Sequence, residues 1–248
     1  MTKFEDYLNS DWIFEGIDIN FTTKTVIFNG SHENIVDTSI SNNPSSQDNS
    51  YFVFKRKKGL GKTDGNPLFY ALKNEKGWKM SDAHRNEIWN RVEQILSKLP
   101  NDFDVLVMPP SSSSLMKLFK DKILDRFKDI DYIENCLLKR TTEEVWDDIN
   151  FPDFTEDELL DLDSAFQKMN KGYFEAKHFH LDDDIIKKFE TSIFKTNPES
   201  RGLEIYGKKV LVLDDIYSRG FTLSKCARTI TENYFPKSVH NVVLLSGI

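Results

Sequence analysis

The second half of the chain alternates apolar runs with segments of helical spacing. FDVLVM and KKVLVL are continuous apolar runs, the pattern of strands that are buried on both faces of a sheet. LMKLFKDKILDRF and TLSKCARTITENYF instead place apolar residues three and four positions apart, which predicts helices. Such alternation is typical of parallel strands with helical crossovers. We therefore predict an α/β fold with a mostly parallel sheet flanked by helices. Its expected strands are residues 103–108, 132–138, 208–213 and 239–246.

The first eighty residues have a different pattern. Residues 11–30 carry short aromatic and β-branched runs, and YFVFKRKKG and NPLFYALKN resemble two further strands joined by a long turn. Before YFVFKRKKG, residues 41–50 are a polar stretch that predicts a surface loop or mobile linker. A helix is predicted from Ser81 to Leu99, and Pro100 ends it. We expect a β-rich N-terminal subdomain at 1–80 and an α/β domain at 81–248.

An acidic segment interrupts the alternation at residues 141–165. It holds ten acidic residues and no basic one. Charge runs are usually solvated, so one interpretation is an exposed loop leading into an acidic helix. The other is a flexible flap over a site.

Composition limits the class of protein. The 248 residues are 39% hydrophobic, enough for a substantial core. The net charge of −7 argues against a nucleic-acid-binding surface, which would need a positive field. Cys136 and Cys226 are far apart in sequence and predict buried, reduced thiols. No apolar run is long enough to span a membrane, and the N-terminus has no apolar signal core. We expect a soluble, cytoplasmic protein.

Two short motifs resemble known sites without matching them. GLGKT at 59–63 ends like a phosphate-binding P-loop, but Arg56 stands where that motif requires glycine, so a basic turn is expected. His178 and His180, followed by three aspartates, are metal-ligand types without a spacing that secures a third ligand.

The stretch VLVLDDIYSRGFTL at 210–223 carries the clearest chemistry. An apolar strand is followed by Asp214 and Asp215, then by a loop with Gly220, and then by a predicted helix near Thr222. The start of a helix and a flexible glycine suit a phosphate group. Carboxylates accept hydrogen bonds and suit a vicinal diol. Together they predict a site for a ribose 5-phosphate.

This stretch resembles the ribose-phosphate signature of type I phosphoribosyltransferases. FDVLVMPPSSSS at 103–114 is similar to that family's pyrophosphate loop, and CLLKRTTEEV, NKGYF and GKKVLVLDD follow the motif order of the competence-protein-F-like branch. The resemblance covers residues 82–248. It implies phosphoribosyl pyrophosphate (PRPP) as ligand, Mg²⁺ as cofactor and transfer of the phosphoribosyl group to a nitrogen acceptor with release of pyrophosphate. The alternative is a non-catalytic regulatory or partner-binding protein that keeps the pocket.

The resemblance also implies residue roles. Asp214 and Asp215 would bind the ribose diol and Mg²⁺, and Lys139 and Arg140 would join them in catalysis. The PRPP and phosphate contacts would come from Tyr217, Ser218, Arg219, Gly220, Phe221, Thr222, Pro110, Ser111, Ser112 and Ser113. Ser218 replaces an aspartate usual in purine-salvage members, which makes purine salvage less expected, and Arg219 stands at a commonly small position. A homodimer or a protein partner would use the N-terminal subdomain.

Overall fold

The computed structural model describes most of the chain. The described residues are 17–20, 22–28, 49–56, 67–169, 172–176, 179, 181–217 and 220–247. The predictions for residues 1–16, for the polar stretch 41–48, for GLGKT, for His178 and His180, and for Ser218 and Arg219 lie outside these residues.

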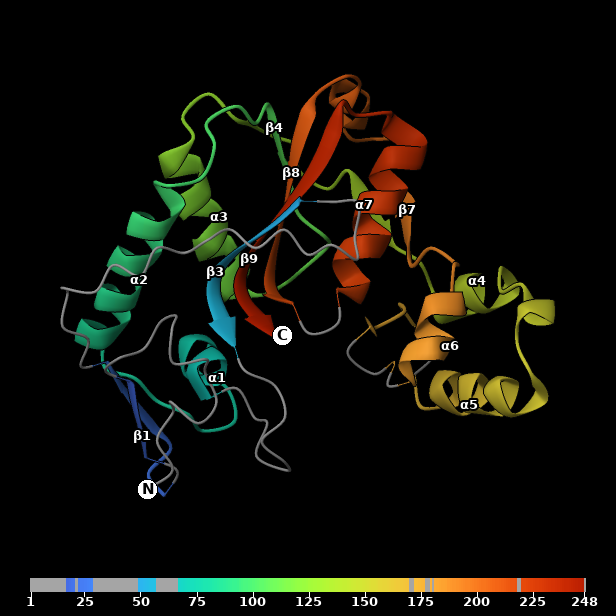
Figure 1. Ribbon diagram of the computed structural model, residues 1–248, viewed down its shortest axis with the longest axis horizontal. Helices are drawn as coiled ribbons and strands as arrows, with labels where there is room; N and C mark the ends of the chain where they lie inside the picture. The colour runs from blue at the N-terminus through green and yellow to red at the C-terminus, as the bar shows by residue number, and fades with distance from the viewer. Residues whose placement is uncertain are drawn as a thin grey trace.

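The centre of the protein is a five-stranded sheet in which every neighbouring pair is parallel, in the order β3-β9-β8-β4-β5. Figure 1 shows β8 and β9 in the middle, with helices on both sides. This confirms the predicted α/β class with a parallel sheet. The strands are β3 (Asn49–Arg56), β4 (Val105–Val107), β5 (Asp131–Tyr132), β8 (Lys209–Tyr217) and β9 (Ser238–Gly247).

The apolar runs within the central strands β4 and β8 are continuous because both of their faces are covered. Val105 pairs with Val210 and Val107 with Val212, and all four side chains are buried. Successive residues of a strand point to opposite faces. Leu211 and Leu213 of β8 therefore join one hydrophobic cluster, while Val210 and Val212 join the other.

Three helices cover the first face: α1 (Pro67–Lys73), α2 (Asp82–Leu96) and α3 (Ser114–Arg126). The predicted helix at 81–99 is confirmed as α2. It begins after Ser81, whose side chain accepts a hydrogen bond from the His84 N–H at 3.3 Å, which is the usual way to cap a helix start. Its buried residues Ile88, Val92 and Ile95 follow the spacing that predicted it.

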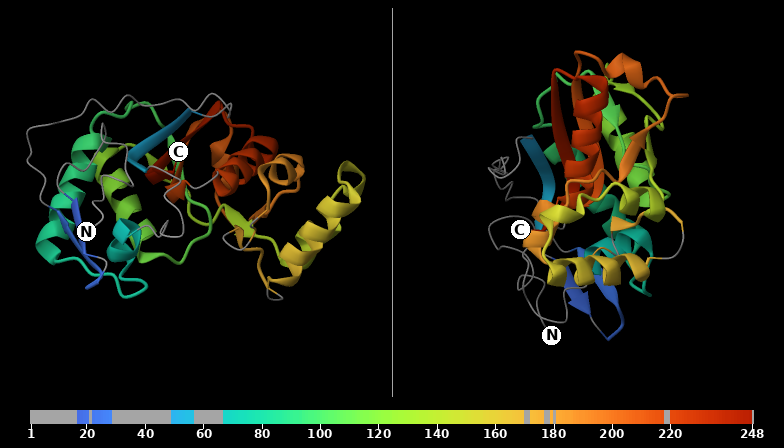
Figure 2. Two further views of the ribbon diagram at one scale, coloured as in Figure 1. Left: turned by 60° about the horizontal axis from the view of Figure 1, so that its bottom comes forward. Right: turned by 90° about the vertical axis from the view of Figure 1, so that its right-hand side faces the viewer.

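The opposite face carries α7 (Phe221–Tyr234) and an insert between β5 and β8. The left view of Figure 2 shows the insert's α5 at the end of the molecule away from α2. The insert contains two antiparallel strands and several short helices. They are β6 (Leu137–Lys139), α4 (Thr142–Asp147), η3 (Phe151–Asp153), α5 (Glu156–Gln167), α6 (Asp183–Lys188), β7 (Phe194–Thr196) and η5 (Gly202–Ile205).

The acidic segment forms packed helices within this insert. Thr141 and Glu144 form a reciprocal capping box at the start of α4, and Thr155 and Glu158 form a second at the start of α5. Val145 and Leu162 are fully buried, as expected for helices with one apolar face. The expectation of an exposed loop at the beginning of the segment was therefore wrong, while the acidic helix after it is confirmed.

The expected strand at 132–138 was also wrong in part. Only β5 joins the parallel sheet, and β6 pairs antiparallel with β7 outside it. Asn135, which lies between β5 and β6, has a positive φ of 53°. Such a conformation interrupts an extended chain, so one apolar run becomes two strands in different sheets.

The N-terminal part differs from its prediction in two places. NPLFYALKN contains the helix α1, because Leu68, Ala71 and Leu72 share a helical spacing and are all buried. Strand β3 pairs along its length with β9, so it belongs to the core sheet. The strands expected within 11–30 are confirmed as the antiparallel pair β1 (Ile17–Asn20) and β2 (Thr25–Phe28). A separate N-terminal subdomain stays a prediction for the residues before β3.

Candidate functional site

The candidate site lies at the point in the sheet where the order of the strands along the chain reverses. The chain passes from β4 through α3 to β5 on one side, and from β8 through α7 to β9 on the other, while β4 and β8 are parallel neighbours. The loops that follow such a pair diverge to opposite faces and leave a crevice at the carboxyl ends of the strands, which is where open α/β sheets bind ligands. Residues 108–113 follow β4, and Gly220 is the described residue between β8 and α7.

The loop after β4 carries a proline pair and three serines. Pro109 is buried and Pro110 is part-buried, whereas Ser111 and Ser112 are exposed. The Ser113 N–H donates to Ser111 Oγ at 3.2 Å, which holds the turn at the start of α3. Ser113 Oγ is itself buried and has no hydrogen-bond partner among the described residues. A buried hydroxyl without a partner is costly unless a ligand or water completes it.

The loop after β8 leads directly into a long helix. Gly220 has φ 71°, the left-handed region that favours glycine, and stands immediately before α7. The first bond of the helix runs from the Ser224 N–H to the Gly220 carbonyl at 2.8 Å. The N–H groups of the first turn, including those of Phe221 and Thr222, therefore have no carbonyl partner within the helix. They supply donors and a partial positive charge at this edge.

Asp214 and Asp215 do not follow the strand, as the sequence suggested, but lie within it. Strand β8 continues to Tyr217, paired with β9 along its length. Because successive strand residues point to opposite faces, Asp215 shares the face of Leu213 and Asp214 the face of Val212. The backbone N–H of Asp215 donates to Asp214 Oδ1 at 2.9 Å.

Asp215 forms an ion pair that the sequence did not indicate. Its Oδ2 lies 2.7 Å from Lys73 Nζ, and the two side chains are only 11% and 15% exposed. Lys73 is the last residue of α1 and its Nζ also lies 4.0 Å from the centre of the Phe69 ring. No local sequence signal could have indicated this pair, because the two residues lie far apart in the sequence.

Asp214 has a different electrostatic environment. Burial and, to a smaller extent, the nearby charge of Asp215 together raise the pKa of its carboxyl to about 8. The carboxyl is therefore mostly protonated at neutral pH and can donate a hydrogen bond as well as accept one. Asp214 also raises the pKa of the Cys226 thiol on α7, though less than the burial of that thiol does.

The expected Mg²⁺ does not fit the aspartate pair as a shared ligand. A divalent cation that is held by both carboxylates needs the two to converge on it. Here the two side chains point to opposite faces of β8, and the Asp215 carboxylate is bound by Lys73.

Lys139 and Arg140 lie in the insert. Arg140 donates to the Ser192 carbonyl at 3.1 Å, to the Glu144 carbonyl at 2.5 Å and to the Asp148 carboxylate at 2.5 Å. Lys139 Nζ lies 3.9 Å from Glu175 Oε1. The partners of both residues belong to the insert, so the structure shows them holding the insert together and does not bring them into contact with Asp214 or Asp215.

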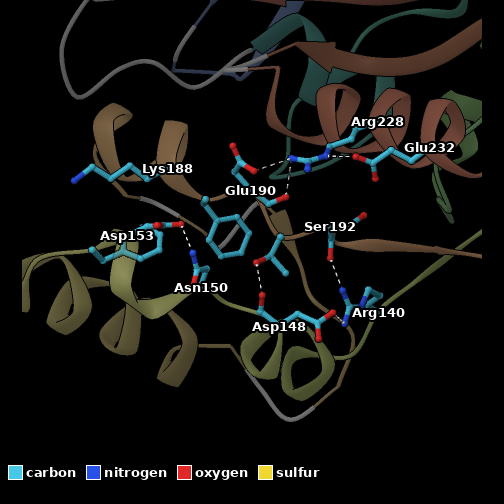
Figure 3. Close-up of a pocket in the computed structure, with 12 residues that line it drawn as sticks. Arg140, Asp148, Asn150, Asp153, Lys188, Glu190, Ser192, Arg228 and Glu232 are labelled. Carbon is cyan, nitrogen blue, oxygen red and sulfur yellow. Dashed lines mark hydrogen bonds and ion pairs between the residues drawn. The ribbon is translucent and has the colours of Figure 1, made fainter.

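A polar pocket of about 380 Å³ lies between the insert and α7 (Figure 3). Arg228 of α7 donates to Glu232 Oε1 at 2.6 Å and to the Glu190 carbonyl at 3.2 Å. The other cations that line the pocket also have acidic partners. Arg140 lies 2.5 Å from the Asp148 carboxylate, and Lys188 lies 2.7 Å from the Glu158 carboxylate. The charged groups of this pocket thus largely satisfy one another, and it contains none of the predicted site residues except Arg140.

The insert also contacts the beginning of α7. The Phe221 ring packs against Phe174, Phe179 and Phe189, with ring centres 5.4 to 6.5 Å apart. Lys225, one turn further along, is buried and donates to the Phe189 carbonyl. The position of the first turn of α7 therefore depends on the insert.

Within the described residues, no helix combines the length and apolar character needed to cross a membrane. A scan against models of protein families finds no match for this chain, and a search of curated proteins finds none either. The resemblance to phosphoribosyltransferases therefore rests on the motifs alone and stays a prediction.

Proposed function

We propose that the crevice between residues 108–113 and 217–222 binds the ribose 5-phosphate part of PRPP or of a nucleotide. The observation that carries this proposal is the arrangement of the two loops. They follow neighbouring parallel strands at the point where the crossovers diverge, and each leads into a helix. One ligand with two phosphate-bearing ends can contact both loops.

The roles in this proposal follow from the chemistry of each loop. The first-turn N–H groups at Phe221 and Thr222 bind the 5′-phosphate, since a helix start favours anions. Gly220 allows the backbone to approach the phosphate closely. Tyr217, Ser218 and Arg219 complete this loop in the sequence.

The other end of the ligand lies against the loop after β4. The orphaned hydroxyl of Ser113 and the exposed Ser111 and Ser112 offer donors to a pyrophosphate group, with Pro110 fixing the turn. Asp215 accepts hydrogen bonds from the ribose hydroxyls between the two loops.

The reaction in this proposal is phosphoribosyl transfer. The bond between C1 and the pyrophosphate oxygen breaks with its electron pair going to pyrophosphate, and a nitrogen acceptor forms the new bond to C1. The protein contributes by holding both groups in line and by stabilising charge on the leaving group. Lys139 and Arg140 are left outside this assignment because their partners lie in the insert.

The non-catalytic alternative is favoured by one observation. Asp215 is paired with Lys73, and a protein that only senses a ribose phosphate has no need of an ionised carboxylate free for chemistry. Measuring pyrophosphate release from PRPP against a panel of nitrogen acceptors separates the two functions. Release with any acceptor supports the transferase, and tight PRPP binding without release supports the binding protein.

The binding site itself is tested with two matched glycine variants. Gly220 and Gly207 both have φ 71°, and Gly207 precedes β8 at the opposite end of the strand, where an added Cβ meets nothing within 4 Å. Gly220→Ala should weaken PRPP binding in calorimetry by about tenfold or more, the loss expected when a charged hydrogen bond is removed. Gly207→Ala introduces the same backbone strain and should leave the affinity unchanged.

Asp215→Asn should also weaken PRPP binding, by about ten- to a hundredfold, because a carboxylate accepts stronger hydrogen bonds than an amide does. The proposed site is wrong if the wild type does not bind PRPP at millimolar concentration. It is also wrong if both glycine variants bind PRPP equally well.

A further inference from the structure

The ion pair between Lys73 and Asp215 connects the N-terminal part of the chain to the candidate site. The two side chains are mostly shielded from solvent, and their charged atoms lie 2.7 Å apart. Electrostatic attraction is stronger in such an environment than at an exposed surface, and each charge depends on the other. Lys73 is thus a fixed positive charge beside the carboxylate that we assign to the ribose hydroxyls.

The position of Lys73 is held by the packing of its helix. Leu68, Ala71 and Leu72 of α1 are buried in the core. The end of the helix is secured by Arg85 of α2, which donates to the Leu72 carbonyl at 2.7 Å and to the Ala71 carbonyl at 3.1 Å. Lys73 follows these residues directly, so its side chain starts from an anchored backbone.

A divalent cation at Asp215 would need the same carboxylate that the Lys73 ammonium occupies. Asp214 cannot supply a second ligand from the same direction, because it faces the other side of β8. A lysine ammonium has three donors and a compact charge, so it can neutralise a carboxylate and still donate to a ligand oxygen.

We propose that Lys73 takes the place of a protein-bound divalent cation at Asp215, so that the crevice binds its ribose phosphate without Mg²⁺. This inference rests on the proposed ribose-phosphate site. In it, Lys73 balances the charge of Asp215 when the anionic ligand enters, and its remaining donors contact ligand oxygens. Lys73 is therefore a ligand-binding residue contributed by a helix outside the signature.

The test uses ribose 5-phosphate, which lacks the pyrophosphate that binds Mg²⁺ in solution, so that any effect of the ion arises at the protein. Its affinity for the full-length protein is measured by calorimetry with Mg²⁺ and with EDTA. The wild type should bind equally well in both buffers, within about threefold. Lys73 supplies the positive charge in both, so removing Mg²⁺ removes no charged contact.

Lys73→Met should lose about tenfold or more of this affinity in EDTA, since Asp215 then repels the ligand and a charged contact is gone. Mg²⁺ should recover most of the loss by restoring a cation at the carboxylate. Lys73→Arg keeps the charge and should bind in EDTA like the wild type. Lys76→Met is the matched control, because Lys76 is an exposed lysine three positions away whose Nζ bonds the Tyr70 hydroxyl at 2.6 Å.

The folding of each variant is verified by circular dichroism. A double variant that combines Lys73→Met with Asp215→Asn has no unpaired buried charge at this position. That double variant should bind weakly and without any response to Mg²⁺. The inference is overturned if the wild type loses its affinity in EDTA, or if Lys73→Met binds like the wild type in both buffers. The proposed site then still stands, provided Gly220→Ala weakens binding. If the wild type binds neither ribose 5-phosphate nor PRPP in either buffer, the proposed function fails and this inference fails with it.

Discussion

Replacing Asp214 by asparagine should remove a pH dependence from the stability of this protein. Burial raises the pKa of this carboxyl from 3.8 to about 8, and the charge of Asp215 contributes in the same direction. Asparagine keeps the size of the side chain and an oxygen that can accept the Asp215 N–H, which lies 2.9 Å from Asp214 Oδ1. The substitution therefore removes the titration while leaving the packing largely intact.

The sign follows from where the proton is held. Between the unfolded and folded pKa values, the folded protein retains a proton that the unfolded chain releases, so the free energy of unfolding falls as pH rises. The stabilisation is complete below the unfolded pKa near 4 and is lost as pH rises through the folded pKa near 8. Each pH unit in that window corresponds to about 1.4 kcal/mol, so between pH 5 and pH 8 the expected loss is on the order of 4 kcal/mol. A domain is typically stable by only about 5–15 kcal/mol, so the effect is large.

The assay is urea unfolding at a series of pH values from 5 to 8, for the wild type and for Asp214→Asn. The difference between the two free energies of unfolding isolates Asp214 from the other titrating groups. That difference should change steadily in favour of the variant as pH rises. Asp129→Asn is the control, because it makes the same chemical change at an exposed aspartate.

A constant difference between wild type and Asp214→Asn across this range would refute the reasoning. It would mean that the carboxyl titrates alike in the folded and unfolded chains, and hence that water or a cation reaches it in the folded protein. The assignment of Asp214 as a protonated group within β8 would then be wrong.

Two further predictions concern the packing of the core. Gly202→Ala places a Cβ 2.5 Å from the ring of Tyr234, whose hydroxyl donates to the Cys136 carbonyl at 2.9 Å. The substitution should therefore lower the free energy of unfolding by about 1–3 kcal/mol. An unchanged melting temperature would show that the ring moves freely. Cys136 and Cys226 are both buried and unpaired, which confirms the sequence prediction, and burial raises the pKa of Cys136 to about 12. Neither thiol should react with a disulfide reagent in the native protein, while both should react after denaturation, and rapid labelling of the native protein would contradict the structure.

The parallel core could be predicted from the sequence because burial on both faces leaves a clear pattern. A strand segment that is covered by helices on both faces forms a continuous apolar run, as Val105–Val107 does. A covering helix instead repeats its apolar residues with the helical period, as α2 does. The glycine in the signature was readable as a residue that lets the backbone bend before a helix, and Gly220 takes a positive φ there.

Short apolar runs were less informative. Residues 67–72 fit a strand or a buried helix equally well, and only the surrounding core decides between them. The run at 132–138 contains enough apolar residues for one strand, yet the turn at Asn135 divides it between two sheets. Local sequence does not record which neighbouring strand a segment will meet.

The sequence by itself determined which residue types meet the ends of β4 and β8: the serine loop, the aspartate pair and the glycine before α7. Only the tertiary structure decided what surrounds them. It continued β8 through the aspartates, so that their side chains diverge, and it brought Lys73 against Asp215 from a distant helix. The reason is physical: alternation along a strand is local, but the charge that a buried carboxylate meets depends on elements that pack together only in the folded chain.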